Sequence, residues 1–82
     1  MVVVGTAVPD RVLDCLGDFC PMPILRTRAV IDEMDVGQIL ELMVDDRAAE
    51  EDIQRWAKRT GHRIVDMFWV ERRLTFHIQK LH

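Results

Sequence analysis

The segment FCPMP, residues 19–23, holds the side chain best suited to chemistry. It places Cys20 directly before Pro21, with a second proline at position 23. Proline disfavours helical backbone in the residue before it and is itself favoured at the first position of a helix. We therefore expect Cys20 to be the N-cap of a helix. At the positive end of a helix dipole the pKa of a thiol is lowered, which favours the nucleophilic thiolate.

The residues after Cys20 should hold the sulfur in one place. Pro21 and Pro23 fix two φ angles. Met22 and Ile24 keep backbone N–H groups, which we expect to stabilise a sulfur anion. A lone cysteine is, however, more often a small buried hydrophobe than a nucleophile, so the residues alone leave both interpretations open.

The second cysteine, Cys15, alternates with Leu13 on one face of a predicted strand, so we expect it to be buried in the core. A redox-active pair of Cys15 and Cys20 is an alternative that requires their Cα atoms to lie within about 7 Å. Two cysteines at this spacing are a poor zinc site. We expect no metal and no cofactor.

The elements that position these residues follow from the spacing of apolar side chains. Strands are predicted at 11–16, 38–44, 62–70 and 72–81, the last two joined by a tight turn. A first helix is predicted from about Pro21 to Met34, and a second between an N-cap pair, Asp45 and Asp46, and Gly61. The order βαβαββ predicts an α/β (α+β) two-layer sandwich, with a four-stranded mixed sheet and two helices on one face.

The chain of 82 residues is expected to be one domain, with residues 1–9 as an N-terminal extension and 10–82 as the core. A net charge of −3 argues against direct nucleic-acid binding. No signal peptide or membrane-spanning run is predicted, so we expect a cytoplasmic protein.

One face of the sheet lacks helices in this prediction. In the third strand Val65, Met67 and Trp69 should share one face, while Ile64, Phe68 and Val70 line the other with Asp66. The uncovered face is expected either to lie under residues 1–8 or to mediate weak self-association. The protein should thus be a monomer or a weak homodimer.

Two segments together resemble the TusA/SirA family of sulfur carriers. LDCLGDFCPMP, residues 13–23, resembles the Cys-Pro-x-Pro signature, and DDRAAEEDIQRWAKRTGH, residues 45–62, resembles the second motif. The likeness covers about residues 11–81. Arg47, which stands where the family commonly has proline, and the VERR turn at 70–73 depart from the pattern, which bears on partner choice more than on chemistry.

The resemblance implies that Cys20 carries sulfur as a persulfide. It implies a cysteine desulfurase or rhodanese-type donor, and a downstream acceptor protein in tRNA thiolation, molybdenum-cofactor synthesis or sulfur oxidation. Such a protein would be a sulfurtransferase or carrier without its own turnover of a small-molecule substrate. We expect partners to dock on the exposed side of the first helix, at Leu25, Arg26, Arg28 and Ala29. The alternatives are a regulatory module that binds protein or RNA, and a Cys15/Cys20 redox sensor.

Overall fold

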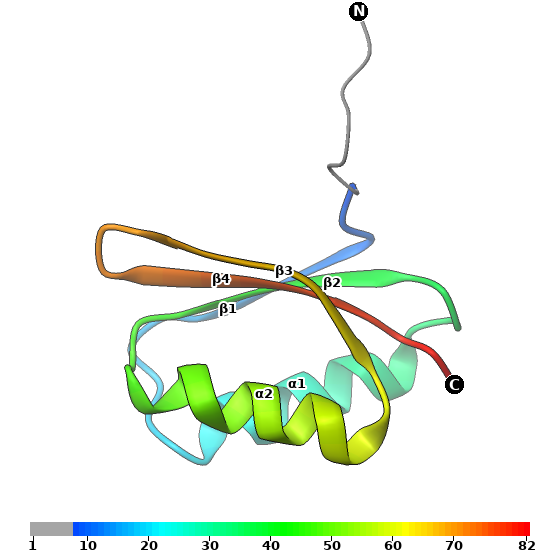
Figure 1. The fold of residues 1–82 in the computed structure, drawn as a ribbon, viewed down its shortest axis with the longest axis horizontal. Helices are drawn as coiled ribbons and strands as arrows, with labels where there is room; N and C mark the ends of the chain where they lie inside the picture. The colour runs from blue at the N-terminus through cyan, green and yellow to red at the C-terminus, as the bar shows by residue number, and fades with distance from the viewer. Residues whose placement is uncertain (1–7) are drawn as a thin grey trace, which may run out of the picture.

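The computed structural model describes residues 8–82, which form six elements (Figure 1). In chain order they are β1 (Arg11–Cys15), α1 (Met22–Glu33), β2 (Ile39–Val44), α2 (Ala48–Thr60), β3 (Arg63–Val70) and β4 (Arg73–Gln79). The predicted order βαβαββ is confirmed, with most ends within a residue or two of those expected from the sequence.

The four strands form one mixed sheet in the order β1-β2-β4-β3. Strand β1 pairs parallel to β2, whereas β4 pairs antiparallel to both β2 and β3. Both helices cover the same face of the sheet and the other face has no helix (Figure 1). The two-layer α+β sandwich expected from the sequence is therefore confirmed. Because β1 and β2 are parallel, both of their carboxyl ends and the starts of both helices lie at one end of the molecule.

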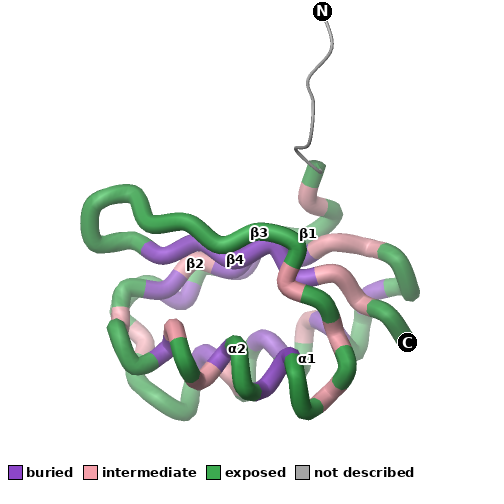
Figure 2. Tube along the Cα trace, viewed as in Figure 1, coloured by how far each residue is buried: buried purple, intermediate pink, exposed green. Residues whose placement is uncertain are grey.

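The core lies between the helices and the sheet, where the inward sides of the elements are buried (Figure 2). Thr27, Ile31 and Met34 of the first helical segment are buried, and Ile24 and Val30 pack against them. The second helix buries one stripe at helical spacing, as its sequence predicts: Ala49, Ile53, Trp56 and Ala57.

The faces of β3 differ from the sequence prediction. A bulge shifts the register between Ile64, which pairs with Ile78, and Asp66, which pairs with His77. The extra residue, Val65, breaks the alternation because two residues of β3 then oppose one residue of β4. Placing Ile64 on the same face as Phe68 was therefore wrong: its partner Ile78 belongs to the buried row that faces the helices.

The face without helices is partly polar and partly buried by its own side chains. His77 is 5% exposed, and its Nε2 lies 3.0 Å from Oε1 of Glu41 on β2. The ring of Phe68 packs edge-on against the His77 ring, with centroids 5.8 Å apart. The prediction that residues 1–8 cover this face concerns mainly residues 1–7, which lie outside the described residues. Val8, the one residue of that segment that is described, is exposed.

The turns use left-handed backbone where the direction of the chain reverses. Gly61 ends α2 with φ 84°, and its N–H bonds to the Ala57 carbonyl at 2.9 Å, as the sequence predicts. In the β3–β4 hairpin the left-handed position is filled by Glu71, with φ 56°. No helix within residues 8–82 is long and apolar enough to cross a membrane.

Candidate functional site

Cys20 lies in the loop between β1 and α1, at the end of the molecule where both helices start. Its side chain is exposed, whereas Cys15 at the end of β1 is 0% exposed, and both thiols are free. The predicted contrast between an accessible and a packed cysteine is therefore confirmed. Burial raises the pKa of Cys15 to about 11, which leaves this thiol protonated and unreactive at neutral pH.

The prediction that Cys20 caps α1 was wrong. The helix begins at Met22, its N-cap is Pro21, and no side chain bonds to the free N–H groups of the first turn. The backbone donors expected to face the sulfur have other partners, because Met22 N–H bonds to the Phe19 carbonyl and Ile24 N–H to the Pro21 carbonyl. The thiol thus lies one residue further from the helix than the sequence suggested.

The pKa of Cys20 is shifted in the direction opposite to the one expected from a capping position. Interaction with the Asp52 carboxylate of α2 is the largest cause of the shift and, together with desolvation and the charge of Asp46, raises the pKa of Cys20. Thiol and carboxylate face a narrow crevice between the two helices, whose other lining residues are Pro23, Ile24 and Ala49. Asp52 therefore favours the protonated thiol in the free protein.

The loop that carries Cys20 is tied to the rest of the fold by two carboxylates. Both oxygens of Asp45 accept the N–H of Gly17, at 3.0 and 3.1 Å. Asp18 forms an ion pair with Arg26 of α1. These contacts, together with the two prolines, hold the loop between β1 and the start of the helix.

The two residues predicted to cap α2, Asp45 and Asp46, have different hydrogen-bond partners. Asp46 accepts the N–H of Ala48 at 3.0 Å and so satisfies a free donor of the first turn, although the N-cap position itself is occupied by Arg47. Asp45 takes no part in capping and binds Gly17 instead. The sequence identified both carboxylates but not the contact that joins the two loops.

The residues proposed for docking on α1 are all exposed, but they point to different places. Leu25 is 52% exposed. Arg26 is held by Asp18, at the Cys20 end. Arg28 reaches the hollow near the far end of α2, which is also lined by Asp32, Trp56, Arg59, Thr60, His62 and His82. The exposed side of α1 thus extends from the Cys20 end of the helix to the hollow at the far end of α2.

Asp52 is the neighbour of Cys20 that reasoning from the residues missed. It follows two glutamates in the acidic start of α2, where the helix dipole explains its presence. Only its place in the Asp-Ile of the second motif set it apart from those glutamates. Within residues 8–82 no group of three or more histidine, cysteine or acidic side chains lies close enough together to hold a metal ion.

Comparison with known proteins identifies the family to which the chain belongs. Residues 11–80 match the family described as sulfurtransferase TusA, which is most of the chain. The chain belongs to this family. A putative sulfur carrier protein of Bacillus subtilis is 42% identical over 71 residues, which covers 87% of this chain and 95% of the relative. The sulfur carrier protein TusA of Allochromatium vinosum is 35% identical over 57 residues, covering 70% of this chain and 75% of the relative.

The same fold is also seen in a solved structure. The crystal structure of a SirA-like protein from Desulfitobacterium hafniense superposes with a TM-score of 0.77 and covers 88% of this chain and 99% of its own. At 20% identity this similarity shows the fold alone. It agrees with the mixed sheet and the pair of helices described above.

Proposed function

We propose that this protein is a sulfur carrier that holds sulfane sulfur as a persulfide on Cys20. The observation that carries the proposal is the exposed thiol of Cys20 on a loop fixed by two prolines, in a chain of the TusA family. Relatives described as sulfur carriers support the same chemistry. The buried Cys15 has no role in the transfer.

The transfer needs no oxidant. The Cys20 thiolate attacks the outer sulfur of a persulfide on the donor, a new S–S bond forms on Cys20, and the S–S bond of the donor breaks. The donor leaves as a thiolate and takes up a proton. Delivery to an acceptor repeats the exchange, because the acceptor's nucleophile attacks the outer sulfur of Cys20 and Cys20 leaves as the thiolate.

Asp52 gives this exchange a point of control. The carboxylate beside the thiol raises its pKa and so favours the protonated form, which makes the resting thiol a weaker nucleophile. Proton loss to Asp52 or to water must precede the attack. A carrier that stays protonated between encounters is protected from unspecific oxidation.

The partners we propose are a cysteine desulfurase or rhodanese-type donor and a downstream acceptor protein. Tethering on the exposed side of α1 would bring a partner beside Cys20, because Leu25 and Ala29 lie on the same helix within the first turns. The acceptor we propose is a protein or enzyme-bound group that takes up sulfane sulfur for tRNA thiolation, molybdenum-cofactor synthesis or sulfur oxidation.

The test is loading by a desulfurase in the presence of cysteine, followed by intact mass measurement. The wild-type chain should gain one sulfur atom, which a reducing agent removes. Cys20→Ser should gain none, and the matched control Cys15→Ser should load like the wild type. A sulfur atom retained on Cys20→Ser would refute the assignment of Cys20.

A further inference from the structure

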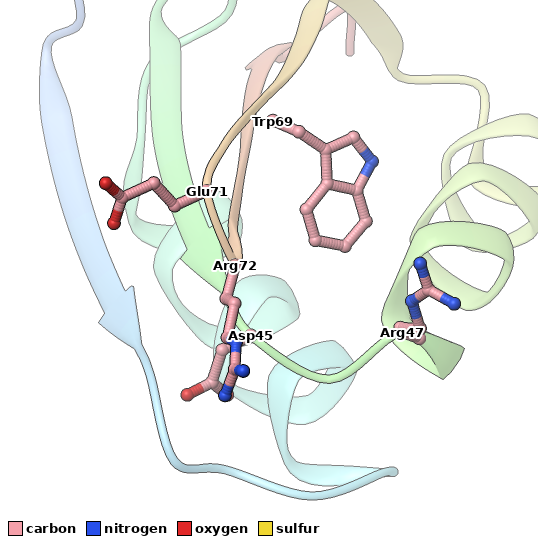
Figure 3. A pocket seen from close by; sticks show the side chains of 5 residues that line it. All are labelled: Asp45, Arg47, Trp69, Glu71 and Arg72. Atoms are coloured by element: carbon pink, nitrogen blue, oxygen red, sulfur yellow. The ribbon is translucent and has the colours of Figure 1, made fainter.

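A cleft of about 510 Å³ separates the start of α2 from the β3–β4 hairpin (Figure 3). Its lining comes from the residues before and at the α2 N-cap and from the hairpin: Asp45, Arg47, Trp69, Glu71 and Arg72. This volume is within the range of about 300–1,000 Å³ that ligand pockets usually have. Nothing in the chemistry proposed for Cys20 uses the cleft.

The guanidinium groups of Arg47 and Arg72 are the charged groups of the cleft that are free to bind an anion. Within residues 8–82 neither Arg47 nor Arg72 forms an ion pair. Asp45 is already engaged, since both of its oxygens accept the Gly17 N–H. Glu71 points to the side of the hairpin opposite to Trp69 (Figure 3). Arg47 and Arg72 therefore line the cleft without ion-pair partners among the described residues, while its two carboxylates, Asp45 and Glu71, are bonded to Gly17 and turned away from Trp69 respectively.

The apolar part of the cleft is the indole of Trp69. This side chain is 39% exposed and extends from the hairpin into the same space as Arg47 (Figure 3), whereas the other tryptophan, Trp56, is 3% exposed in the core. Exposed tryptophan and arginine side chains are the residues most enriched among those that dominate binding energy at protein interfaces. A flat apolar surface beside two guanidinium groups suits a carboxylate with a neighbouring apolar side chain.

The cleft and the thiol lie at the same end of the molecule. Arg47 precedes Ala49 by two positions, and Ala49 lines the crevice of Cys20. Asp45, which also lines the cleft, is bonded to the loop that carries Cys20. A protein that reaches the thiol therefore also covers the start of α2 and can place a side chain in the cleft.

We propose that this cleft is the docking site for an acidic segment of a protein that exchanges sulfur with Cys20. An aspartate or glutamate of the partner binds between Arg47 and Arg72, and an adjacent apolar side chain packs on Trp69. The identity of the partner as a sulfur-exchanging protein rests on the proposed function; the binding of an acidic segment does not.

The experiment uses a fluorescein-labelled peptide of alternating glutamate and leucine, titrated with the full chain and followed by fluorescence anisotropy at an ionic strength of about 0.15 M, where the Debye length is about 8 Å. Arg47→Glu and Arg72→Glu should each weaken binding about tenfold, because one partner of a charge pair becomes repulsive. Trp69→Ala should weaken it about fivefold. Circular dichroism checks that each variant is folded.

The matched control is Arg59→Glu, which makes the same change of charge in the last turn of α2, within the hollow that also contains His62. It should bind the peptide within about twofold of the wild type, since exposed charges separated by more than a Debye length are largely screened. Equal losses in Arg59→Glu and Arg47→Glu would overturn the proposal, as would unchanged binding in both cleft variants.

Two further measurements distinguish this docking proposal from binding of small anions and from the proposed function of Cys20. If inorganic sulfate, added at the concentration of the peptide, displaces the peptide, the cleft is a site for small anions and the docking proposal is wrong. Loading of Cys20 by inorganic polysulfide, read by intact mass, needs no docking. Failure of that loading counts against the proposed function, whereas normal loading with no peptide binding counts only against the docking site.

Discussion

Both carboxylate oxygens of Asp45 accept the backbone N–H of Gly17, at 3.0 and 3.1 Å, across 28 positions of sequence. This contact joins the loop that leads to Cys20 to the loop that leads to α2. It therefore fixes the thiol relative to the second helix, which supplies Asp52, and relative to the cleft that begins at Arg47.

Removing this contact should loosen the loop. Asp45→Ala is expected to lower the free energy of unfolding by about 1 kcal/mol, because a hydrogen bond to a charged group is lost at an exposed site. Hydrogen exchange at the Gly17 amide should become faster. Asp45→Asn, which keeps one acceptor oxygen, should lie between Asp45→Ala and the wild type. An unchanged exchange rate in Asp45→Ala would show that the loop is held by other contacts.

Asp52 should control the reactivity of Cys20. Asp52→Asn removes the charge that raises the pKa of the thiol, so the pKa should fall and the rate of alkylation by iodoacetamide should rise at neutral pH. The pH profile of the rate should move to lower pH. Glu51→Gln is the matched control, since Glu51 and Asp52 both pair with Arg55 but Glu51 does not contribute to the pKa of Cys20. A profile that does not move would exclude Asp52 as the cause.

Cys15 should make stability depend on pH in the alkaline range. Burial raises the pKa of its thiol from 9.0 to about 11, so between these values the unfolded chain loses a proton that the folded chain retains. The contribution is complete below pH 9 and is lost as the pH rises towards 11. Urea unfolding of Cys20→Ser should show this loss, and the added change Cys15→Ala should reduce it. If the free energy of unfolding fell equally steeply with pH in both chains, the buried and protonated state of Cys15 would be contradicted.

The exposed side of α1 should affect transfer without affecting the fold. We expect Arg28→Glu to slow sulfur transfer from a desulfurase about threefold to tenfold, as reversal of one interface charge does. Its thermal unfolding should be close to that of the wild type, because the side chain is exposed. Arg63→Glu, an equal change of charge at the start of β3, should transfer at the wild-type rate. Equal rates for the two variants would count against docking on α1.

The fold was largely predictable because its signals are local. The stripe of α2 and the left-handed Gly61 follow from residues close together in sequence, and they were confirmed. The third strand was predicted as a strand but with the wrong faces, since alternation assumes one residue per position and the bulge at Val65 adds one. Nothing in the composition of IVDMFWV distinguishes a regular strand from a bulged one.

The sequence by itself determined that one cysteine would precede two prolines at the start of a helix and that the other would pack in a strand. Both results depend on backbone preference and periodicity within a few residues. Tertiary structure decided what surrounds the exposed thiol. Packing α2 beside α1 brings Asp52 to Cys20 and turns a thiol expected to ionise easily into one that stays protonated. The pairing of β1 with β2 joins Asp45 to Gly17, because these two residues follow the paired strand ends Val44 and Cys15.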